Sequence, residues 1–453
     1  MQRYDANRVV ILYGTLLQAI SLLVLPSFIS QVLQTTAWIG EMFFVRRIGD
    51  TAIAAIGAVD EATWLPFTLV ASMLTAATTL IAQSWGAGDE EATQVYVETA
   101  IQQGLILGAL IMTLWFCREF VWRIFNLSET VEELATRYLL IFVLFTIPIV
   151  SGFPFVALYQ GIGDMVTPLI ATGVGVLLQL TLNALLITKL GISGVACAAV
   201  SSYCVRLLLL VALLRHLPIK LSLRKLINWN KEAHCKLLKL ALPVWLQTVQ
   251  WSLCSFVLFS IVGRTANSTE ALAALTLGWR IESLLLIPAF SFATAAQTIV
   301  GQNVGAGQIE RARSHSYLVA LIGAVILAVV GFFFIVTADL WARTFSQNEL
   351  TVRYTASYLR MNALAEPLVA VGMIIGSSLR GAGDTLSPAL ITVFSIWFVR
   401  IPTAYYLCMI KGYDATAAWL SMAISNVVGG LLTIPAMERF WKLKRSQQGG
   451  NKS

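Results

Sequence analysis

Ionisable side chains inside long apolar stretches are the residues of this sequence best suited to chemistry. Glu41 lies in AWIGEMFFV, and Glu366 immediately precedes Pro367. Burying a carboxylate in an apolar medium is costly, so an acid kept there usually binds and releases a proton or a cation. The alternative for Glu41 is a pairing with Arg46 or Arg47 at a membrane edge. We expect a cation-coupling role for Glu41.

Two amides accompany this acid in a later apolar stretch. Gln179 and Asn183 are separated by four positions, so they share one face of a helix. Their side chains can hydrogen-bond Glu41 or supply amide oxygens to a cation. The alternative is that they hold neighbouring helices together by hydrogen bonds. We include both in the candidate coupling site.

A second group of ionisable residues lies in the C-terminal half. Arg280 and Glu282 occur in GWRIESLLLIP, where a spacing of two places them on different helix faces, so each needs another partner. Glu366 is a second possible protonation site. Arg400, just before an Ile-Pro pair, is either its counter-charge or a side chain that extends to the membrane surface. We treat these four residues as a possible second ionisable cluster.

The motifs of enzymes and metal sites are missing from the sequence. It contains no H-E-x-x-H, P-loop, G-x-S-x-G or zinc-ligand spacing, and its three histidines are isolated. The six cysteines show no CxxC spacing. We therefore expect no catalytic residue, no metal site and no cofactor. Without a nucleotide-binding domain, the energy for any transport would come from an ion gradient, H+ or Na+.

The composition places nearly all of these residues in a membrane. Hydrophobic residues make up 57% of the 453 residues, charged residues only 12%, and the mean hydropathy is +0.76. Apolar runs long enough to cross about 30 Å of hydrocarbon recur along the chain. We expect an all-α integral membrane protein with twelve spans, starting near residues 17, 53, 96, 137, 167, 193, 238, 270, 316, 355, 386 and 415.

The distribution of basic residues predicts the orientation of these spans. The side that holds both termini and the central loop receives 17 of the 31 Lys and Arg residues, and the opposite side receives 11. By the positive-inside rule, both termini are cytoplasmic in a cell membrane. This rule also accounts for the net charge of +7 without a nucleic-acid partner. Pro26 and Pro243 fall within two unusually long spans, where we expect helix kinks.

Two halves of the sequence resemble each other. Residues 75–88 (TAATTLIAQSWGAG) match residues 294–307 (TAAQTIVGQNVGAG) at eight of fourteen positions. Residues 161–168 (GIGDMVTP) match 381–388 (GAGDTLSP) at four of eight, at nearly the same offset. Each half holds an even number of spans, so the two enter from the same side. We expect two homologous six-helix bundles related by a pseudo-two-fold axis along the membrane normal.

This repeat suggests four regions of the chain. Residues 1–215 would form an N-lobe and residues 237–445 a C-lobe. Residues 216–236 would form a basic cytoplasmic linker with an amphipathic helix on the membrane surface, and residues 446–453 a disordered tail. The glycine turns GAGD, GIGD, GAG and GAGD would lie on the cytoplasmic side, with Asp164 and Asp384 capping the helices that follow.

These motifs together resemble the multidrug and toxic compound extrusion (MATE) family. The resemblance is carried by Pro26, EMFFVRRIGDTAIAAIG (41–57), the paired QSWGAG and GQNVGAG segments, the paired QGIGD and RGAGD turns, and GISGVACAAV (191–200). It covers nearly the whole chain. Membership implies a cation-coupled antiporter that exports organic, often cationic and amphiphilic, compounds through a cavity between two lobes, working without a cofactor.

The resemblance also assigns roles to individual residues. Glu41 stands where the family typically has an Asp in its first helix, so it implies a cation-coupling role for Glu41. In the fifth helix, Gln179 and Asn183 stand where one branch of the family has Asn and Asp. Another branch has acids in the seventh and tenth helices, where this chain has Trp251 and Val369.

The expected function is therefore export of small organic molecules by a monomer in contact with membrane lipid, in exchange for H+ or Na+. Two alternatives remain open. A flippase for lipid-linked precursors would need a strongly basic cleft, for which Arg206, Arg280 and Arg400 are few and scattered. A membrane-embedded enzyme acting on lipids would need clustered His, Asp, Glu or Ser groups, which the sequence does not show.

Overall fold

The regular structure of this chain is helical throughout the part that can be described. The computed structural model describes residues 2–217, 219 and 228–450, and every regular element in these ranges is a helix. The helices form two compact units, Met1–Leu242 and Pro243–Ser453, called here unit 1 and unit 2. The predicted all-α architecture is confirmed.

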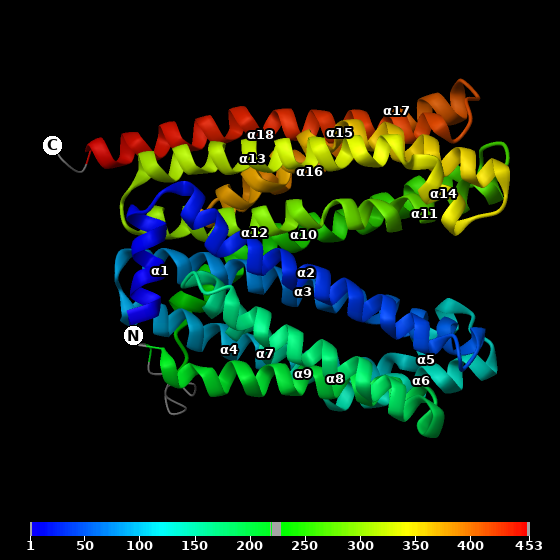
Figure 1. The fold of residues 1–453 in the computed structure, drawn as a ribbon, viewed down its shortest axis with the longest axis horizontal. Helices are drawn as coiled ribbons and strands as arrows, with labels where there is room; N and C mark the ends of the chain where they lie inside the picture. Colours follow the sequence, from blue (N-terminus) through cyan, green and yellow to red (C-terminus); the bar gives the residue numbers. More distant parts are fainter. Residues whose placement is uncertain (1, 218, 220–227, 451–453) are drawn as a thin grey trace. The chain divides into compact units, whose positions relative to one another are not determined.

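Unit 1 contains the helices of the N-terminal half and the first turns of α10. Its elements are α1 (Gln2–Tyr13), α2 (Leu16–Val45), α3 (Asp50–Ala87), α4 (Glu90–Met112), α5 (Leu114–Phe125), α6 (Glu129–Leu144), α7 (Thr146–Gly161), α8 (Val166–Leu190), α9 (Ile192–Leu213), the 3-10 turn η1 (Leu214–His216) and the beginning of α10 (Lys231–Val262). Helix α8 packs against α2 and α9, while α3 and α4 pack against α7 (Figure 1).

Unit 2 contains the rest of α10 and all later elements. These are α11 (Ser268–Leu285), α12 (Ile287–Gly305), α13 (Ile309–Val336), α14 (Ala338–Phe345), α15 (Glu349–Gly381), α16 (Leu386–Phe394), the π-helix η3 (Ser395–Arg400), α17 (Ile401–Tyr405), the π-helix η4 (Tyr406–Ile410) and α18 (Thr416–Gly450). Helix α15 lies at the centre of this unit, with α12, α13 and α18 packed against it (Figure 1).

The described helices agree with the expected number of membrane spans. Ten are long and apolar enough to cross a membrane, and two bent helix pairs bring the number to twelve if each pair is one span. The pair α6–α7 bends by 53° and the pair α11–α12 by 49°. Pro148 and Pro288 lie in the first turns of α7 and α12, where a residue without an N–H cannot continue the preceding helix. Pro26 and Pro243 lie inside α2 and α10, and the kinks expected there stay a prediction.

The sequence repeat is visible in the turns that precede α8 and α16. Gly163 and Gly383 have φ of +85° and +97°, a conformation that glycine adopts without strain. Asp164 accepts backbone N–H bonds from the second and third residues after it at 3.0 and 3.1 Å. Asp384 does the same at 3.1 and 3.0 Å. Both turns thus use one chemistry to begin a helix, as predicted.

Helix α1 ties together two glycine turns of unit 1. The Asn7 side-chain amide donates to the carbonyl of Gly163 at 3.1 Å. The Arg8 guanidinium donates to the carbonyl of Gly86, also at 3.1 Å. Because Gly163 lies in the turn after α7 and Gly86 in the last turn of α3, α1 connects segments that are distant in sequence.

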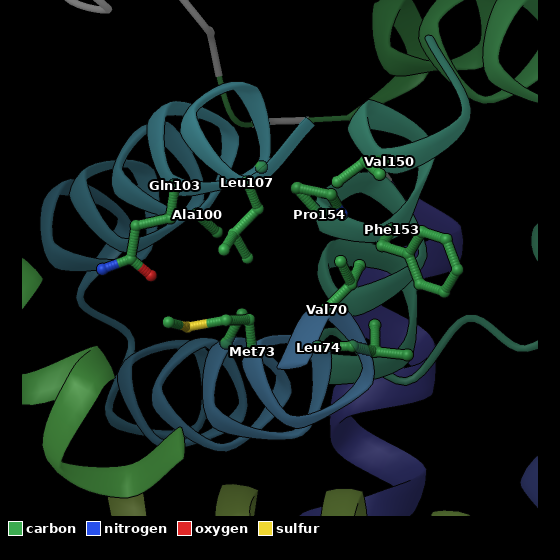
Figure 2. A pocket seen from close by; sticks show the side chains of 11 residues that line it. Val70, Met73, Leu74, Ala100, Gln103, Leu107, Val150, Phe153 and Pro154 are labelled. Atoms are coloured by element: carbon green, nitrogen blue, oxygen red, sulfur yellow. The ribbon is translucent and has the colours of Figure 1, made fainter. Parts of the chain in front are cut away.

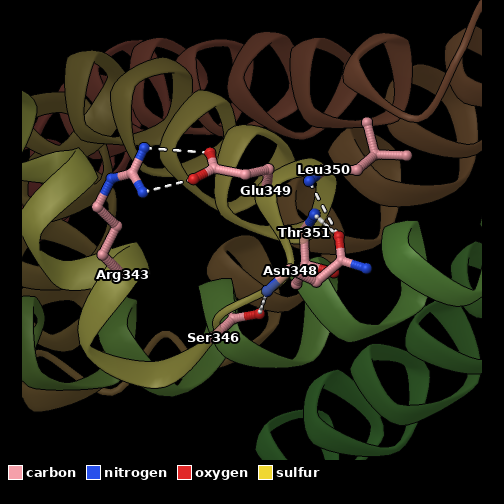
Figure 3. A network of polar contacts seen from close by, with 6 residues as sticks. All are labelled: Arg343, Ser346, Asn348, Glu349, Leu350 and Thr351. Atoms are coloured by element: carbon pink, nitrogen blue, oxygen red, sulfur yellow. Dashed lines mark hydrogen bonds and ion pairs between the residues drawn. The ribbon is translucent and has the colours of Figure 1, made fainter.

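The start of the central helix of unit 2 is fixed by its own cap. The side-chain oxygen of Asn348 accepts from the backbone N–H groups of Leu350 and Thr351 at 2.9 and 3.1 Å. Arg343, at the end of α14, makes two hydrogen bonds of 2.7 and 3.1 Å to the carboxylate of Glu349 (Figure 3). These contacts set where α15 begins, and α15 carries three of the polar residues described below.

The division between the units falls inside α10 rather than at its start. Leu237 and Ala241 belong to the hydrophobic cluster of α3, α4 and α7. One turn earlier, the ring of His234 stacks on Trp229 with centroids 3.6 Å apart, and its Nε2 lies 2.9 Å from Oε1 of Gln102 on α4. The first turns of α10 therefore pack with unit 1, although residues from 237 onward were expected in the C-lobe.

The two polar segments outside the lobes differ in how far the structure describes them. The amphipathic linker helix was expected within 216–236, but residues 218 and 220–227 lie outside the described residues. At the other end, α18 continues to Gly450, so residues 446–450 are helical rather than disordered as expected. This stretch, SQQGG, contains no proline and continues the preceding KLKR segment (442–445), whose residues favour helix formation. Residues 451–453 lie outside the described part.

Candidate functional sites of the two units

The expected coupling residues of the N-terminal half do come together in unit 1. Glu41 on α2 is only 9% exposed. Its Oε2 accepts a hydrogen bond of 2.6 Å from the side-chain amide of Gln179 on α8. The two residues are 138 positions apart in sequence, so their contact depends on the packing of α2 against α8. It places a carboxylate inside the lobe with a polar donor aimed at it.

Two further residues at this site were missed by the sequence reasoning. The side chain of Tyr138 on α6 is a second hydrogen-bonding group facing Glu41. Asp60 on α3 is close enough for its charge to act on Glu41, and it is exposed whereas Glu41 is buried. Asp60 is an acid within an apolar run, the same feature by which Glu41 was recognised, so the sequence could have indicated it. Tyr138 gave no such signal.

Asn183 lies on the same helix but is not satisfied in the same way. It is fully buried, and both its side-chain oxygen and nitrogen have no hydrogen-bond partner. Buried polar atoms are almost always paired, so an unpaired amide marks a place for a water or another small polar ligand. No direct contact between Asn183 and Glu41 is present. Its membership in the coupling site stays a prediction.

The second ionisable cluster forms in unit 2 with three of its four expected members. The hydroxyl of Tyr358 on α15 donates to Glu282 on α11. Glu366, two turns further along α15, is fully buried, and neither of its carboxyl oxygens receives a hydrogen bond from an N–H or hydroxyl donor. Its polar neighbour is the carboxyl group of Glu282. Two acids from different helices therefore meet inside this unit.

Arg400 is the buried cation beside this pair. It is 3% exposed, and its Nε donates to Ser425 at 2.8 Å while its Nη2 donates to Asn426 at 2.6 Å. Its guanidinium lies over the ring of Trp251 at 5.1 Å, and its charge acts on Glu282. It thus faces inward as a counter-charge and does not extend to the membrane surface.

Arg280, the fourth expected member, lies on the exposed side of α11, and its membership in the cluster stays a prediction. Its side chain is exposed, whereas Glu282 is partly buried. Residues two positions apart point about 200° away from each other around a helix, so one of them faces out when the other faces in. The way α11 is rotated about its axis turns Glu282 inward and Arg280 outward.

An apolar pocket lies elsewhere in unit 1, between α3, α4 and α7. It holds about 280 Å³ of empty space, part of it open, and is lined by residues such as Met73, Leu107 and Phe153 (Figure 2). Its polar lining group is Gln103, whose amide lies 3.2 Å from Nδ1 of His234. The pocket is therefore mostly apolar, with one amide at its edge.

The described residues contain no group of three or more His, Cys, Asp and Glu side chains that would hold a metal ion. The candidate sites of both units are instead small sets of acids, amides and tyrosines inside helical bundles. In a membrane protein, such residues mark the path of a solute or a coupling ion.

The comparison with family models decides between the expected classes of membrane protein. The MatE family model matches this chain twice, at residues 26–185 and 243–406, together more than half of its length. The chain belongs to the MatE family. The two matched segments lie one in each half, in agreement with the internal repeat. Membership makes the chain a multi-pass membrane transporter and not an enzyme, which removes the lipid-enzyme alternative.

Individual relatives of this MatE protein are similar over nearly their whole length. The probable multidrug resistance protein YoeA of Bacillus subtilis is 26% identical over 448 residues, covering 94% of this chain and 95% of the relative. The probable multidrug resistance protein NorM of Thermotoga maritima is 24% identical, with 90% and 88% covered.

Solved structures share the same fold. A MATE protein crystallised in a bent conformation has a TM-score of 0.91 at 23% identity, covering 98% of this chain and 99% of that one. A MOP superfamily transporter from Pyrococcus furiosus has a TM-score of 0.90 at 23% identity, covering 96% and 98%. The work on this second protein describes a binding pocket of reversed polarity and infers from it a different function. At these identities, the similarity shows the fold.

Proposed function

We propose that this chain is a secondary active antiporter that exports organic, often cationic and amphiphilic, compounds in exchange for H+ or Na+. Transport would proceed by alternating access between two six-span lobes of a monomer, in a cell membrane with both termini cytoplasmic. Relatives named as probable multidrug resistance proteins support drug export over the flippase alternative. The buried acids of each unit supply groups through which an ion gradient can act.

The observation that carries this proposal is the hydrogen bond of 2.6 Å from Gln179 to the buried carboxylate of Glu41. A coupling ion drives transport only if it binds the two conformational states with different affinity. A carboxylate inside an apolar lobe binds an ion with different affinity in the two states when only one state exposes the carboxylate to water. Asp60, which is exposed and beside it, offers a route for the ion.

The groups around Glu41 favour H+ over Na+ at this site. Gln179 presents its amide nitrogen to the carboxylate, and Tyr138 presents a hydroxyl. These are hydrogen-bond donors, whereas a metal cation needs several oxygen ligands that turn their lone pairs toward it. One carboxylate with donors can hold and release a proton by itself. We therefore assign proton exchange to Glu41.

Export of a fluorescent cationic dye from vesicles tests this assignment. We expect a pH gradient to drive export by the unchanged protein. In Glu41→Gln, export driven by the gradient should fall about 5- to 150-fold, the range that corresponds to 1–3 kcal/mol of coupling. A Na+ gradient is imposed in a separate arm.

Glu119→Gln provides the matched control, because Glu119 is an exposed acid paired with its neighbour Arg118. This variant should export at the unchanged rate. Undiminished gradient-driven export by Glu41→Gln would remove Glu41 from the coupling mechanism. Export driven only by the Na+ gradient would reject the assignment of H+.

The acid pair of unit 2 is a second candidate coupling site. Glu366 has no donor for either carboxyl oxygen, and its polar neighbour Glu282 is also an acid. Two adjacent carboxylates in an apolar interior cannot both be ionised at low cost, so they share a proton or bind a cation. We expect Glu366→Gln to lower gradient-driven export as well, measured in the same vesicles.

A further inference from the structure

Oxygen atoms without hydrogen-bond donors line one face of α15 in unit 2. Tyr358, Asn362 and Glu366 follow each other at intervals of four residues, so they lie along one helical face. Asn362 is 2% exposed, and its side-chain oxygen has no partner, like both oxygens of Glu366. Glu282 faces the same place from α11. Carboxylate and amide oxygens are the ligands that hard metal cations prefer.

The same place already contains a cation that belongs to the protein. Arg400 comes from η3 and is held by Ser425 and Asn426 of α18 at 2.8 and 2.6 Å. Trp251 of α10 lies under its guanidinium, and Cys254 of the same helix is a further neighbour. These contacts hold the charge near Glu282 without a direct ion pair. The carboxyl pair keeps its own hydrogen bond, from Tyr358 to Glu282.

The backbone of the eleventh span fixes the direction of Arg400. It is the last residue of the π-helix η3, and Pro402 stands in the first turn of α17 directly after it. A π-helical turn holds an additional residue and rotates the side chains that follow, and such turns frequently occur at functional sites. The guanidinium is therefore held in place from both the backbone and its partners on α18.

We propose that Arg400 determines the ion specificity of the Glu282–Glu366 site: its guanidinium supplies the fixed positive charge there, so the site exchanges protons and excludes Na+. This inference rests on the proposed coupling role of the acid pair. A Na+ ion among these oxygens would lie beside a permanently charged guanidinium and be repelled by it. Protonating a carboxyl group near the guanidinium also costs electrostatic attraction, but the proton forms a covalent O–H bond that is strong enough to offset this cost, whereas the weak ionic contacts of Na+ are not.

Binding of Na+ to the purified protein in detergent, measured with radioactive Na+ at alkaline pH, tests this proposal. The unchanged protein should show no saturable Na+ binding. Arg400→Gln and Arg400→Met, which remove the charge but keep a long side chain, should gain saturable binding. That binding should disappear when Glu366→Gln is added. Arg400→Lys keeps the positive charge and should exclude Na+ like the unchanged protein.

Arg360→Gln is the matched control, because Arg360 lies on α15 but is exposed and paired with Asp339. It should not gain Na+ binding. Saturable Na+ binding by the unchanged protein would overturn the proposal, and this arm needs no variant to fold. Absence of Na+ binding in neutral variants that remain folded by circular dichroism would overturn it too. If Glu366→Gln left dye export unchanged, the coupling role of the pair would fail, independently of the binding result.

Discussion

Two buried acids of this transporter, Glu41 and Glu366, are surrounded by different kinds of groups. Glu41 faces the amide of Gln179 and the hydroxyl of Tyr138, which stabilise its charged form. Glu366 has no donor and lies beside another acid, so its surroundings favour a bound proton. One lobe thus presents hydrogen-bond donors to its carboxylate, whereas the other places two acids side by side.

Replacing Gln179 tests the first of these environments. Gln179→Ala removes a donor from a buried carboxylate, and hydrogen bonds to charged groups contribute about 1.5–3 kcal/mol. We expect slower dye export in a pH gradient and a lower melting temperature in detergent. Thr181→Ala is the control, since its exposed hydroxyl bonds only to the carbonyl of Leu177 on its own helix. Equal export rates in the two variants would contradict a role for Gln179 in holding Glu41.

At the scale of elements, helices that lie far apart in the sequence are connected by single polar contacts at their ends. Asn7 and Arg8 of α1 each donate to a carbonyl of a glycine turn, one after α7 and the other at the end of α3. In the same unit, His234 joins the start of α10 to α4 through Gln102. These contacts lie at helix ends, where backbone carbonyls are left without partners by the helix itself. The contacts of Asn7 and Arg8 therefore satisfy carbonyls that the helices leave unpaired.

Hydrogen exchange measured by mass spectrometry tests the role of α1. In the double variant Asn7→Ala, Arg8→Ala, the turns at 86–89 and 161–164 should exchange faster, because each lost bond contributes about 0.5–1.5 kcal/mol. Asp5→Asn changes an exposed residue of the same helix and should leave both turns as they are. Unchanged exchange in the double variant would mean that α1 does not hold the turns.

At the scale of the whole molecule, the repeat determines the orientation of the chain. The family model matches residues 26–185 and 243–406, one segment in each unit. Six spans in each half return the chain to the side on which it started, so both termini and the central linker share one side of the membrane. By the positive-inside rule, the excess of Lys and Arg on that side predicts that it is the cytoplasmic one.

Two native cysteines report this topology. Cys117 on α5 and Cys235 at the start of α10 are both exposed, and the predicted orientation puts them on opposite sides of the membrane. We expect a membrane-impermeant maleimide to label a variant that keeps only Cys117 in right-side-out vesicles. A variant that keeps only Cys235 should be labelled only after permeabilisation. The reverse pattern of labelling would invert the proposed topology.

The sequence by itself determined the features that depend on local chemistry. Hydropathy predicted twelve spans, because the length of an apolar run follows directly from the thickness of the membrane. Matching residues at a constant offset predicted the duplicated bundle and the capping roles of Asp164 and Asp384. Glu41 could be singled out because an acid in an apolar run is costly wherever the run packs.

Only the tertiary structure decided which polar residues meet. Tyr138 and Asp60 reach Glu41 from other helices, and Glu282 meets Glu366 across α11 and α15. Such contacts depend on how each helix is rotated about its axis, which is set by packing against several neighbours at once. Arg400 also lies at the end of a π-helical turn, which no sequence pattern predicted. The acids themselves could therefore be predicted from the sequence. Their partners, and with them the proposed choice between H+ and Na+, depend on the packing of the helices.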